Sequence, residues 1–216
     1  MNPTEKAGVH REVVEHDCYK MKELKFVPDV IFDIGANVGV FTRYAHDMFP
    51  EADIIAVEPD QENFNTFMMK DVFGITLLQK AIGQGKIYRL NNRWGGAQEC
   101  YHGVMMGYPE ACFDSSTVYK PTEVEAITLA DLVDKYVSDD QKFMVKIDCE
   151  GAENHILEHS PSIEALMKAD YFSIELHYYS AEVSIIENTD NILNIFGLTH
   201  NCQRVTNMFY ATKKGK

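Results

Sequence analysis

Short apolar runs alternate with stretches of helical period along most of the chain. Five of these runs are apolar enough for strands covered on both faces, as in a parallel sheet. They comprise residues 30–32, 54–57, 75–78, 143–147 and 171–174. Two closing strands are predicted at 198–205 and 208–212. Strands that alternate with helices at this spacing predict a doubly wound α/β fold, a seven-stranded and mostly parallel sheet with helices on both faces.

The predicted helices follow the strands in turn. They comprise residues 38–49, 61–69, 152–158 and 185–194, together with a helix that begins at Thr128. Thr128 and Asp131 have the spacing of a capping box. Pro161 is expected to stop the helix that begins at residue 152, because proline cannot continue a helix interior.

Two segments fall outside this alternation. Residues 1–28 read as a charged helical lead-in with a thin stripe of valines. Residues 84–125 lack a long periodic stretch, so we expect a small hairpin near 87–90 and then a long loop. Loops of that length in a compact domain are usually functional or disordered. We therefore predict one domain, residues 29–216, with a loop or hairpin insertion at about 84–125.

Composition excludes several classes of partner. The 216 residues carry 20 basic and 33 acidic side chains, a formal charge of −13 at pH 7. That balance argues against nucleic-acid binding through phosphates and against docking on anionic lipid. No apolar run approaches the roughly 18–20 residues that a membrane span needs, and the first residues lack the apolar core of a secretion signal. Five cysteines without a CxxC pair favour a reducing, cytoplasmic location over a disulfide scaffold.

Polar residues gather at the ends of the predicted strands, where open α/β sheets bind their ligands. Four of the five parallel strands end this way: at Asp33, at Glu58, at 148–150 and at Glu175 with His177. The pattern directs the search for a site to this edge of the sheet.

The turn after the first strand, residues 33–39, is the most specific of these ends. Gly35 lets the backbone approach a ligand, and Gly39 allows close packing of helix against strand. Asn37 stands between them and tolerates a left-handed conformation. A tight turn that binds no ligand is the alternative interpretation.

Glu58 follows Asp33 by 25 residues, at the end of the second strand. A carboxylate there can accept hydrogen bonds from both hydroxyls of a ribose, whereas its alternative is a solvated strand-end acid. The glycines do not complete the dinucleotide fingerprint. The one Tyr–Lys pair with dehydrogenase spacing, Tyr210 and Lys214, lies in the C-terminal tail. S-adenosylmethionine fits better than NAD, because its cationic groups suit a pocket lined by Asp33 and Asp148.

These blocks together resemble one family. The segments DIGANVG at 33–39, Glu58-Pro59 and KIDCEGAE at 146–153 are similar to the FkbM family of class I methyltransferases, as is TLADL at 128–132. The resemblance spans about 29–177. It implies a Rossmann-like fold and methyl transfer from S-adenosylmethionine, usually to a hydroxyl of a sugar, glycan or natural product. It places the cofactor beside residues that include Asp33, Gly35, Asn37, Gly39, Glu58, Pro59, Ala81 and Asp148.

An alcohol acceptor needs help to lose its proton. His177 is our first choice of general base because its ordinary pKa is near 6.5, with Asp148 and Glu150 beside it; an edge histidine without a catalytic role is the alternative. Asp148, Glu175 and His177 could instead hold Mg²⁺ or a similar hard cation. Glu153 is expected to complement the dipole of its own helix.

Two other functions stay open at this stage. One is a binding module that keeps the fold and the nucleoside pocket without turnover. The other is an NAD-dependent oxidoreductase, for which the incomplete fingerprint is unfavourable. Neither the acceptor nor the oligomeric state follows from the sequence, and we expect acceptor choice to depend on the lead-in and on residues 84–125.

Overall fold

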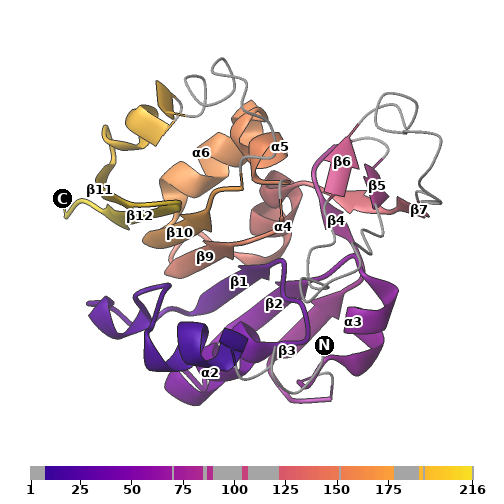
Figure 1. Ribbon diagram of the computed structural model, residues 1–216. Coiled ribbons are helices and arrows are strands. Elements are labelled where there is room, and N and C mark those ends of the chain that lie inside the picture. The colour runs from indigo at the N-terminus through magenta and orange to yellow at the C-terminus, as the bar shows by residue number, and fades with distance from the viewer. Residues whose placement is uncertain are drawn as a thin grey trace.

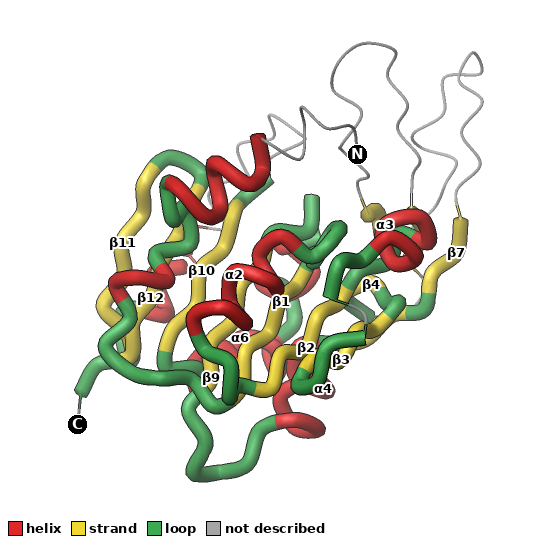
Figure 2. Tube along the Cα trace, turned by 90° about the horizontal axis from the view of Figure 1, so that it is seen from below, coloured by secondary structure: helices red, strands yellow, loops and turns green. Residues whose placement is uncertain are grey.

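The computed structural model describes residues 8–69, 71–84, 87–89, 104–106, 122–150, 152–177, 190–191 and 193–215. Its centre is a seven-stranded sheet in the order β11-β12-β10-β9-β1-β2-β3, which can be followed across Figure 2. The strands are β1 (Val30–Ile34), β2 (Asp53–Val57), β3 (Ile75–Leu78), β9 (Phe143–Ile147), β10 (Tyr171–Glu175), β11 (His200–Val205) and β12 (Met208–Lys213). Strand β12 pairs antiparallel with both neighbours, and the other pairs in the sheet are parallel. The predicted Rossmann-like sheet is confirmed.

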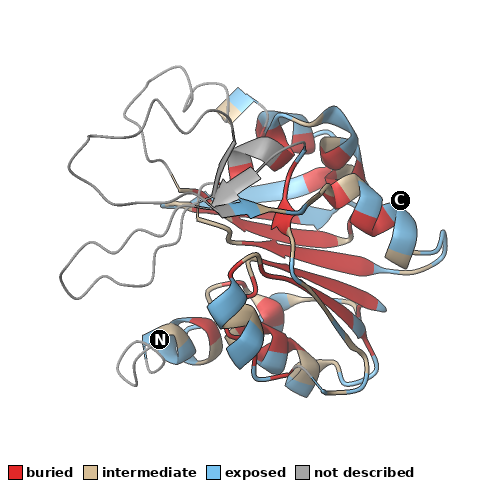
Figure 3. Cartoon of the chain, turned by 90° about the vertical axis from the view of Figure 1, so that its right-hand side faces the viewer, coloured by how far each residue is buried: buried red, intermediate tan, exposed pale blue. Residues whose placement is uncertain are grey.

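Helices cover both faces of the sheet, above and below the buried strands in Figure 3. They are α2 (Val40–Met48), α3 (Gln61–Thr66), α4 (Leu129–Tyr136), α5 (Glu153–Leu157) and α6 (Ser160–Lys168). The N-terminal segment packs with α2 on one face, while α4, α5 and α6 pack on the other (Figure 1). The predicted capping box at Thr128 and Asp131 is present at the start of α4.

Alternation along the strands divides the core between these two layers. In β1, Phe32 belongs to the cluster that includes the helices α4 to α6, whereas Ile31 belongs to the cluster under α2. Both side chains are 0% exposed, as a strand covered on two faces requires. Burying such a side chain contributes roughly 1.5–3 kcal/mol to the free energy of folding. The buried strands therefore provide a firmly packed support for the polar residues that follow them.

The segment before β1 is helical over residues 8–15, α-helical at 8–10 and π-helical beyond, and then forms short turns. It holds the π-helical turn η1 (Arg11–Glu15) and the 3₁₀ turn η2 (Met21–Glu23). The hydroxyl of Tyr171 donates to the carbonyl oxygen of Tyr19 at 2.8 Å, and that of Tyr210 donates to the carbonyl oxygen of Cys18 at 2.8 Å. These bonds tie the lead-in to strands more than 150 residues away in sequence.

Short strands lie beyond β3. The pair β4 (Ala81–Ile82) and β8 (Ala126–Ile127) is parallel, and β5 (Ile87–Arg89) pairs antiparallel with both β6 (Val104–Met106) and β7 (Thr122–Val124). The hairpin expected near 87–90 is thus part of a three-stranded sheet. The remainder of the 84–125 insertion lies outside the described residues, as does most of the helix predicted at 185–194. The division of the chain into a lead-in and one domain stays a prediction.

None of the helices in the described ranges is long and apolar enough to cross a membrane.

Candidate cofactor and active site

A cavity of about 410 Å³ opens at the carboxyl ends of β1, β2, β9 and β10. Its size lies within the range of small-molecule sites. The lead-in contributes part of the wall through Val13 and Tyr19, so the cavity is bounded by the sheet edge on one side and by the start of the chain on the other.

The turn after β1 enters the cavity wall through Gly35. Its φ is +77°, and a Cβ on this residue would lie 1.7 Å from the carbonyl oxygen of Asp148. The amides of Gly35 and Ala36 both donate to the carbonyl oxygen of Val57 at 3.0 Å. No other residue can hold this turn against the neighbouring strand end without displacing it. The requirement for glycine at this position therefore comes from packing against the neighbouring strand end, and the approach of a ligand to Gly35 stays a prediction.

Asn37 and Gly39 complete the turn in different ways. Asn37 has a φ of +51°, the predicted left-handed conformation, and lines the cavity. Gly39 has a φ of +89°, and a Cβ there would lie 2.9 Å from the ring of Phe67. Gly39 is not among the described residues that line the cavity, so its constraint is packing rather than contact with a ligand.

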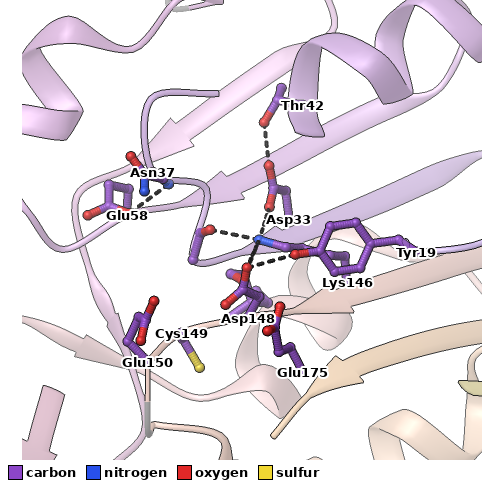
Figure 4. Close-up of polar contacts among 12 residues, drawn as sticks. Tyr19, Asp33, Asn37, Thr42, Glu58, Lys146, Asp148, Cys149, Glu150 and Glu175 are labelled. Carbon is purple, nitrogen blue, oxygen red and sulfur yellow. Dashed lines mark hydrogen bonds and ion pairs between the residues drawn. The ribbon is translucent and has the colours of Figure 1, made fainter. Parts of the chain in front are cut away.

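Glu58 lies at the cavity wall with a defined orientation. One carboxylate oxygen accepts from the amide of Asn37 at 2.8 Å, and the other accepts from the amide of Asp60 at 2.8 Å. The side chain is 6% exposed. Figure 4 shows it beside the glycine turn, across the site from the acids that follow β9. Glu58 is thereby fixed next to the turn, the arrangement that the sequence predicts for a ribose ligand.

Asp33 serves the interior of the protein rather than the cavity surface. It is 0% exposed, lies 3.1 Å from the ammonium of Lys146, and accepts from the hydroxyl of Thr42 at 2.5 Å. Burial alone would lower the pKa of Lys146, but the charges of Asp33 and Asp148 outweigh burial and raise that pKa. The expected pocket lined by Asp33 is therefore corrected: the carboxylate neutralises a buried lysine.

Lys146 also holds the glycine turn. Its ammonium donates to the carbonyl oxygen of Gly35 at 2.7 Å and of Ile34 at 3.3 Å, and it lies 3.8 Å from Asp148 (Figure 4). A buried charge with one partner removed is strongly destabilising, so Asp33 and Lys146 belong together. Through them the end of β9 is tied to the turn after β1.

Asp148 receives a further bond from the lead-in. The hydroxyl of Tyr19 donates to Asp148 Oδ2 at 2.7 Å (Figure 4). Tyr19 is 3% exposed, and its ring meets Phe41 edge-on at 5.2 Å. Two donors, Tyr19 and Lys146, thus lie near the same carboxylate oxygen and turn Oδ1 toward the ends of β9 and β10.

His177 is surrounded by carboxylates. Its Nδ1 lies 3.1 Å from Glu153 Oε1, an oxygen of a side chain that is 1% exposed. Its Nε2 lies 3.7 Å from Glu150, 3.8 Å from Glu175 and 4.0 Å from Asp148. The structure therefore brings together every acid that the sequence places at these two strand ends.

This surrounding charge changes the titration of His177. Burial alone would lower its pKa, but the hydrogen bond and charge of Glu153 and the charges of Glu150 and Asp148 raise it to about 9. The raised pKa favours the protonated form of the imidazole. The ordinary pKa that made His177 attractive as a base does not hold there, and its role stays a prediction.

The backbone at Glu150 is unusual as well. Glu150 has a φ of +53°, a backbone conformation that residues other than glycine rarely adopt. Such residues cluster at functional sites, where the surrounding structure holds them in place. The strain is consistent with the demand that Glu150 face the cavity.

A known domain covers most of this architecture. Residues 33–203 match the Methyltransferase FkbM domain, from the end of β1 to β11. The chain belongs to the FkbM methyltransferase family. The predicted family resemblance is confirmed.

Individual relatives match shorter stretches of this chain. "Methyltransferase 1" of Beauveria bassiana (strain ARSEF 2860) is 33% identical over 92 residues, which is 38% of this chain and 36% of that protein. The 31-O-demethyl-FK506 methyltransferase FkbM of Streptomyces tacrolimicus is 37% identical over 60 residues, or 27% of this chain and 23% of that protein. The chain spans about a third or less of the curated relatives it matches.

A solved structure shares the fold. The crystal structure of methyltransferase FkbM from Methylobacillus flagellatus KT has 17% sequence identity and a TM-score of 0.52, covering 89% of this chain and 46% of that one. At this level of sequence identity the similarity supports the fold alone.

Three residues of the site were not predicted. Tyr19 comes from the lead-in, which is expected to affect acceptor choice although none of its residues is singled out, and Lys146 lies within an apolar strand. Glu153 was assigned to its own helix, whereas it bonds the amide of Cys149 at 2.9 Å and the ring of His177. A lysine inside an otherwise apolar strand was the one available signal, because a buried charge demands a partner.

Of the two remaining residues predicted to contact the cofactor, one lines the cavity and the other does not. Pro59 lines the cavity. Ala81 lies in β4, is 1% exposed and is absent from the described cavity wall, although its neighbours Lys80 and Ile82 belong to it.

Proposed function

We propose that this chain is an S-adenosylmethionine-dependent methyltransferase that acts on a hydroxyl oxygen of a small molecule or glycan. The observation that carries the proposal is the cavity at the strand ends, in which Glu58 stands beside the glycine turn and a carboxylate–histidine cluster lies at β9 and β10. Membership of the FkbM family gives this cavity its chemistry.

The residues at the β1 and β2 ends fit a nucleoside cofactor. Glu58 is oriented by two backbone amides, as an acceptor for ribose hydroxyls must be. Asn37 Oδ1 is buried without a hydrogen-bond partner among the described residues, and so offers an acceptor to a donor of the ligand. When bound, S-adenosylmethionine supplies an electrophilic methyl group on a positively charged sulfur.

The acceptor belongs on the other side of the cavity. Between Glu58 at the end of β2 and Glu175 at the end of β10 stand β1 and β9, so about 14 Å separates these strand ends at ~4.8 Å per strand. Acids at β9 and β10 therefore lie apart from the ribose side. Methyl transfer is an in-line displacement, and alignment of acceptor and methyl group is its main requirement.

The negative charge at the β9 and β10 ends of the cavity has a role in methyl transfer. Asp148, Glu150 and Glu175 present carboxylates where a hydroxyl acceptor would lie. They favour a nearby sulfonium, and a carboxylate or the imidazole beside them can take the acceptor's proton. His177 can take it only if its pKa falls from about 9, which a bound cation would cause because like charges disfavour each other.

Transfer to oxygen is supported by one relative. The Streptomyces tacrolimicus protein is named for methylation of 31-O-demethyl-FK506, an acceptor that lacks an O-methyl group. The acidic composition, −13 in total, favours a small molecule or glycan over nucleic acid as the acceptor.

Transfer of label from methyl-tritiated S-adenosylmethionine tests the proposal. The purified full chain is incubated with a panel of sugars, glycans and hydroxylated natural products, and labelled products are separated and identified. We expect one class of acceptor to take up the methyl group on oxygen. Cofactor binding without transfer across the panel would favour a non-catalytic binding module, and binding of NAD instead would favour an oxidoreductase.

A further inference from the structure

Three side chains at the ends of β9 and β10 are arranged as metal ligands. Asp148, Glu175 and His177 each offer one ligand atom, and these atoms all lie within 4.8 Å of one another. Ligands about 2.1 Å from a common ion stand about 3–4 Å apart. The separations of His177 Nε2 from Glu175 and Asp148, 3.8 and 4.0 Å, are close to that range before any ion draws them together.

This cluster differs from a group of surface acids because it contains a histidine whose ring orientation is fixed by a further residue. Glu153 lies 3.1 Å from Nδ1 of His177 and is 1% exposed, so it fixes which ring nitrogen faces the carboxylates. A metal-bound histidine almost always donates its second ring nitrogen to such an acceptor, which sets the tautomer and the ring orientation. Glu153 comes from α5 and is not itself one of the three ligands.

Each carboxylate ligand also has a partner outside the trio. The amide of Asn207 donates to Glu175 Oε1 at 2.9 Å, and the hydroxyl of Tyr19 donates to Asp148 Oδ2 at 2.7 Å. Metal-binding carboxylates are typically held in this way by hydrogen bonds from the surrounding protein. The three ligand side chains are therefore all oriented by residues that do not take part in coordination.

We propose that Asp148, Glu175 and His177 bind a divalent cation of the Mn²⁺ class on the acceptor side of the cavity. One imidazole with two carboxylates suits a borderline ion better than Mg²⁺, which prefers oxygen ligands alone. Glu150, 3.7 Å from His177, adds negative charge to the same place. His177 then serves as a ligand and not as the general base.

The role of the cation rests on the proposed function. A hydroxyl of the acceptor that approaches the ion has its pKa lowered, and its proton leaves to water. The oxygen then forms its bond to the methyl carbon as the carbon–sulfur bond breaks, with the electron pair of that bond remaining on sulfur. An acceptor with two neighbouring oxygens would fit best, because both can face the same ion.

Direct binding of Mn²⁺ tests the site without any turnover. The full chain is freed of metal by a chelator and dialysed, Mn²⁺ is added, and the unbound ion is measured by electron paramagnetic resonance. We expect one Mn²⁺ bound per chain, and at least tenfold weaker binding in Glu175→Gln and in His177→Gln. Glu158→Gln, which removes an exposed carboxylate outside the cavity, is the matched control and should bind as the wild type does.

Two results would overturn the inference. One is the absence of Mn²⁺ binding by the wild-type chain at millimolar ion. The other is unchanged affinity in both ligand variants, with circular dichroism showing that they are folded. A Zn²⁺ or Mg²⁺ titration in competition with Mn²⁺ then ranks the ions.

A second titration separates this inference from the proposed function. S-adenosylhomocysteine is added to the metal-free chain and to the Mn²⁺-loaded chain. Binding to both supports a cation beside the cofactor, whereas release of Mn²⁺ by the nucleoside shows that these acids serve the cofactor and overturns the metal site. Mn²⁺ retention with no nucleoside binding would sink the proposed function while leaving the metal site standing.

Discussion

Single residues at the end of β1 decide whether the cavity can form. Gly35 is the clearest case, because a Cβ at this position would meet the carbonyl oxygen of Asp148 at 1.7 Å, and φ is +77°. The carbonyl belongs to the backbone of the neighbouring strand end, so it cannot move aside as a flexible side chain would. The turn and the start of the Asp148 loop must separate to accommodate any side chain.

Gly35→Ala should therefore lower the free energy of unfolding by about 3 kcal/mol or more, from overpacking and from a left-handed backbone. Urea unfolding followed by circular dichroism measures the change. Gly8→Ala is the control, because a Cβ there meets nothing within 4 Å. Equal stability of Gly35→Ala and the wild type would show that the turn is not packed as described.

His200 links stability to pH at a place far from the cavity. It is 1% exposed in β11, and its Nε2 lies 2.9 Å from the carbonyl oxygen of Ala169. Burial lowers the pKa of His200, and the charge of Lys213 lowers it further against the opposing effect of that carbonyl. The unfolded chain therefore binds a proton at a higher pH than the folded chain does.

The sign of the pH dependence follows. Above the ordinary histidine pKa of about 6.5 neither state is protonated here, and as pH falls below 6.5 the unfolded state gains the proton first. This residue should therefore make stability fall on acidification, by at most about 1.4 kcal/mol per pH unit. Urea unfolding at pH 7.5 and 5.5 measures the slope, which should shrink in His200→Gln and persist in the exposed control His10→Gln.

The sequence shows which polar residues follow each strand, but it shows less clearly in which direction their side chains point. Glu58 and Asn37 occupy the predicted places because a strand end and a turn fix them locally. Asp33 could not be placed correctly, because its partner Lys146 is 113 positions away and meets it only through strand pairing. The segment around Asp33 does not indicate this contact, and the lysine within the apolar strand at 143–147 is the one signal of it.

At the scale of elements, the N-terminal segment is the surprise. It follows no long helical period, yet Tyr19 crosses to Asp148 and the hydroxyls of Tyr171 and Tyr210 hold its backbone. Short turns carry little signal in sequence, because their conformation depends on what they pack against. A segment expected to affect acceptor choice thus also forms part of the cavity wall.

Tyr19→Phe tests whether this contact serves the site or only the fold. Loss of a hydrogen bond to a charged acceptor should cost about 1–3 kcal/mol of stability. Tyr210→Phe is the matched control, because it removes a bond from the same segment to a strand without touching Asp148. We expect both variants to be less stable and only Tyr19→Phe to weaken Mn²⁺ binding. Equal Mn²⁺ affinity in the two variants would assign Tyr19 a purely structural role.

The sequence predicts the strands of the central sheet more reliably than the helices. A buried parallel strand is apolar throughout, so its position can be read directly from the sequence. The sequence does not predict α6, because Pro161 reads as a stop signal, whereas Pro161 lies in the first turn of α6, where proline leaves no helix bond unmade. The hydrophobic pattern alone does not show that one helix ends near residue 158 and a second helix begins directly after it.

At the scale of the whole molecule, topology brings the site together. Strands β10, β9, β1 and β2 are neighbours in the sheet although their sequence positions span more than 140 residues. Their shared direction sends all four carboxyl ends to one edge, where the glycine turn, Glu58 and the acids of β9 and β10 meet. The fold class was enough to predict this meeting, but not which side chains face inward.

The overall charge of −13 has a local counterpart in that edge. Asp148, Glu150, Glu153 and Glu175 surround a single imidazole, and this end of the cavity is suited to cations. Cofactor and metal ion are both cationic ligands, so the same field favours both. Titration with neutral S-adenosylhomocysteine removes the sulfonium charge and isolates recognition of the nucleoside.

Calorimetric titration of S-adenosylhomocysteine into the full chain tests the central claim most directly. We expect one nucleoside bound per chain and at least tenfold weaker binding, about 1.4 kcal/mol, in Glu58→Gln. Glu51→Gln, a change of an exposed acid near β2, should bind as the wild type does. Absence of binding at millimolar nucleoside, or equal affinity in the folded Glu58→Gln variant, would contradict the account.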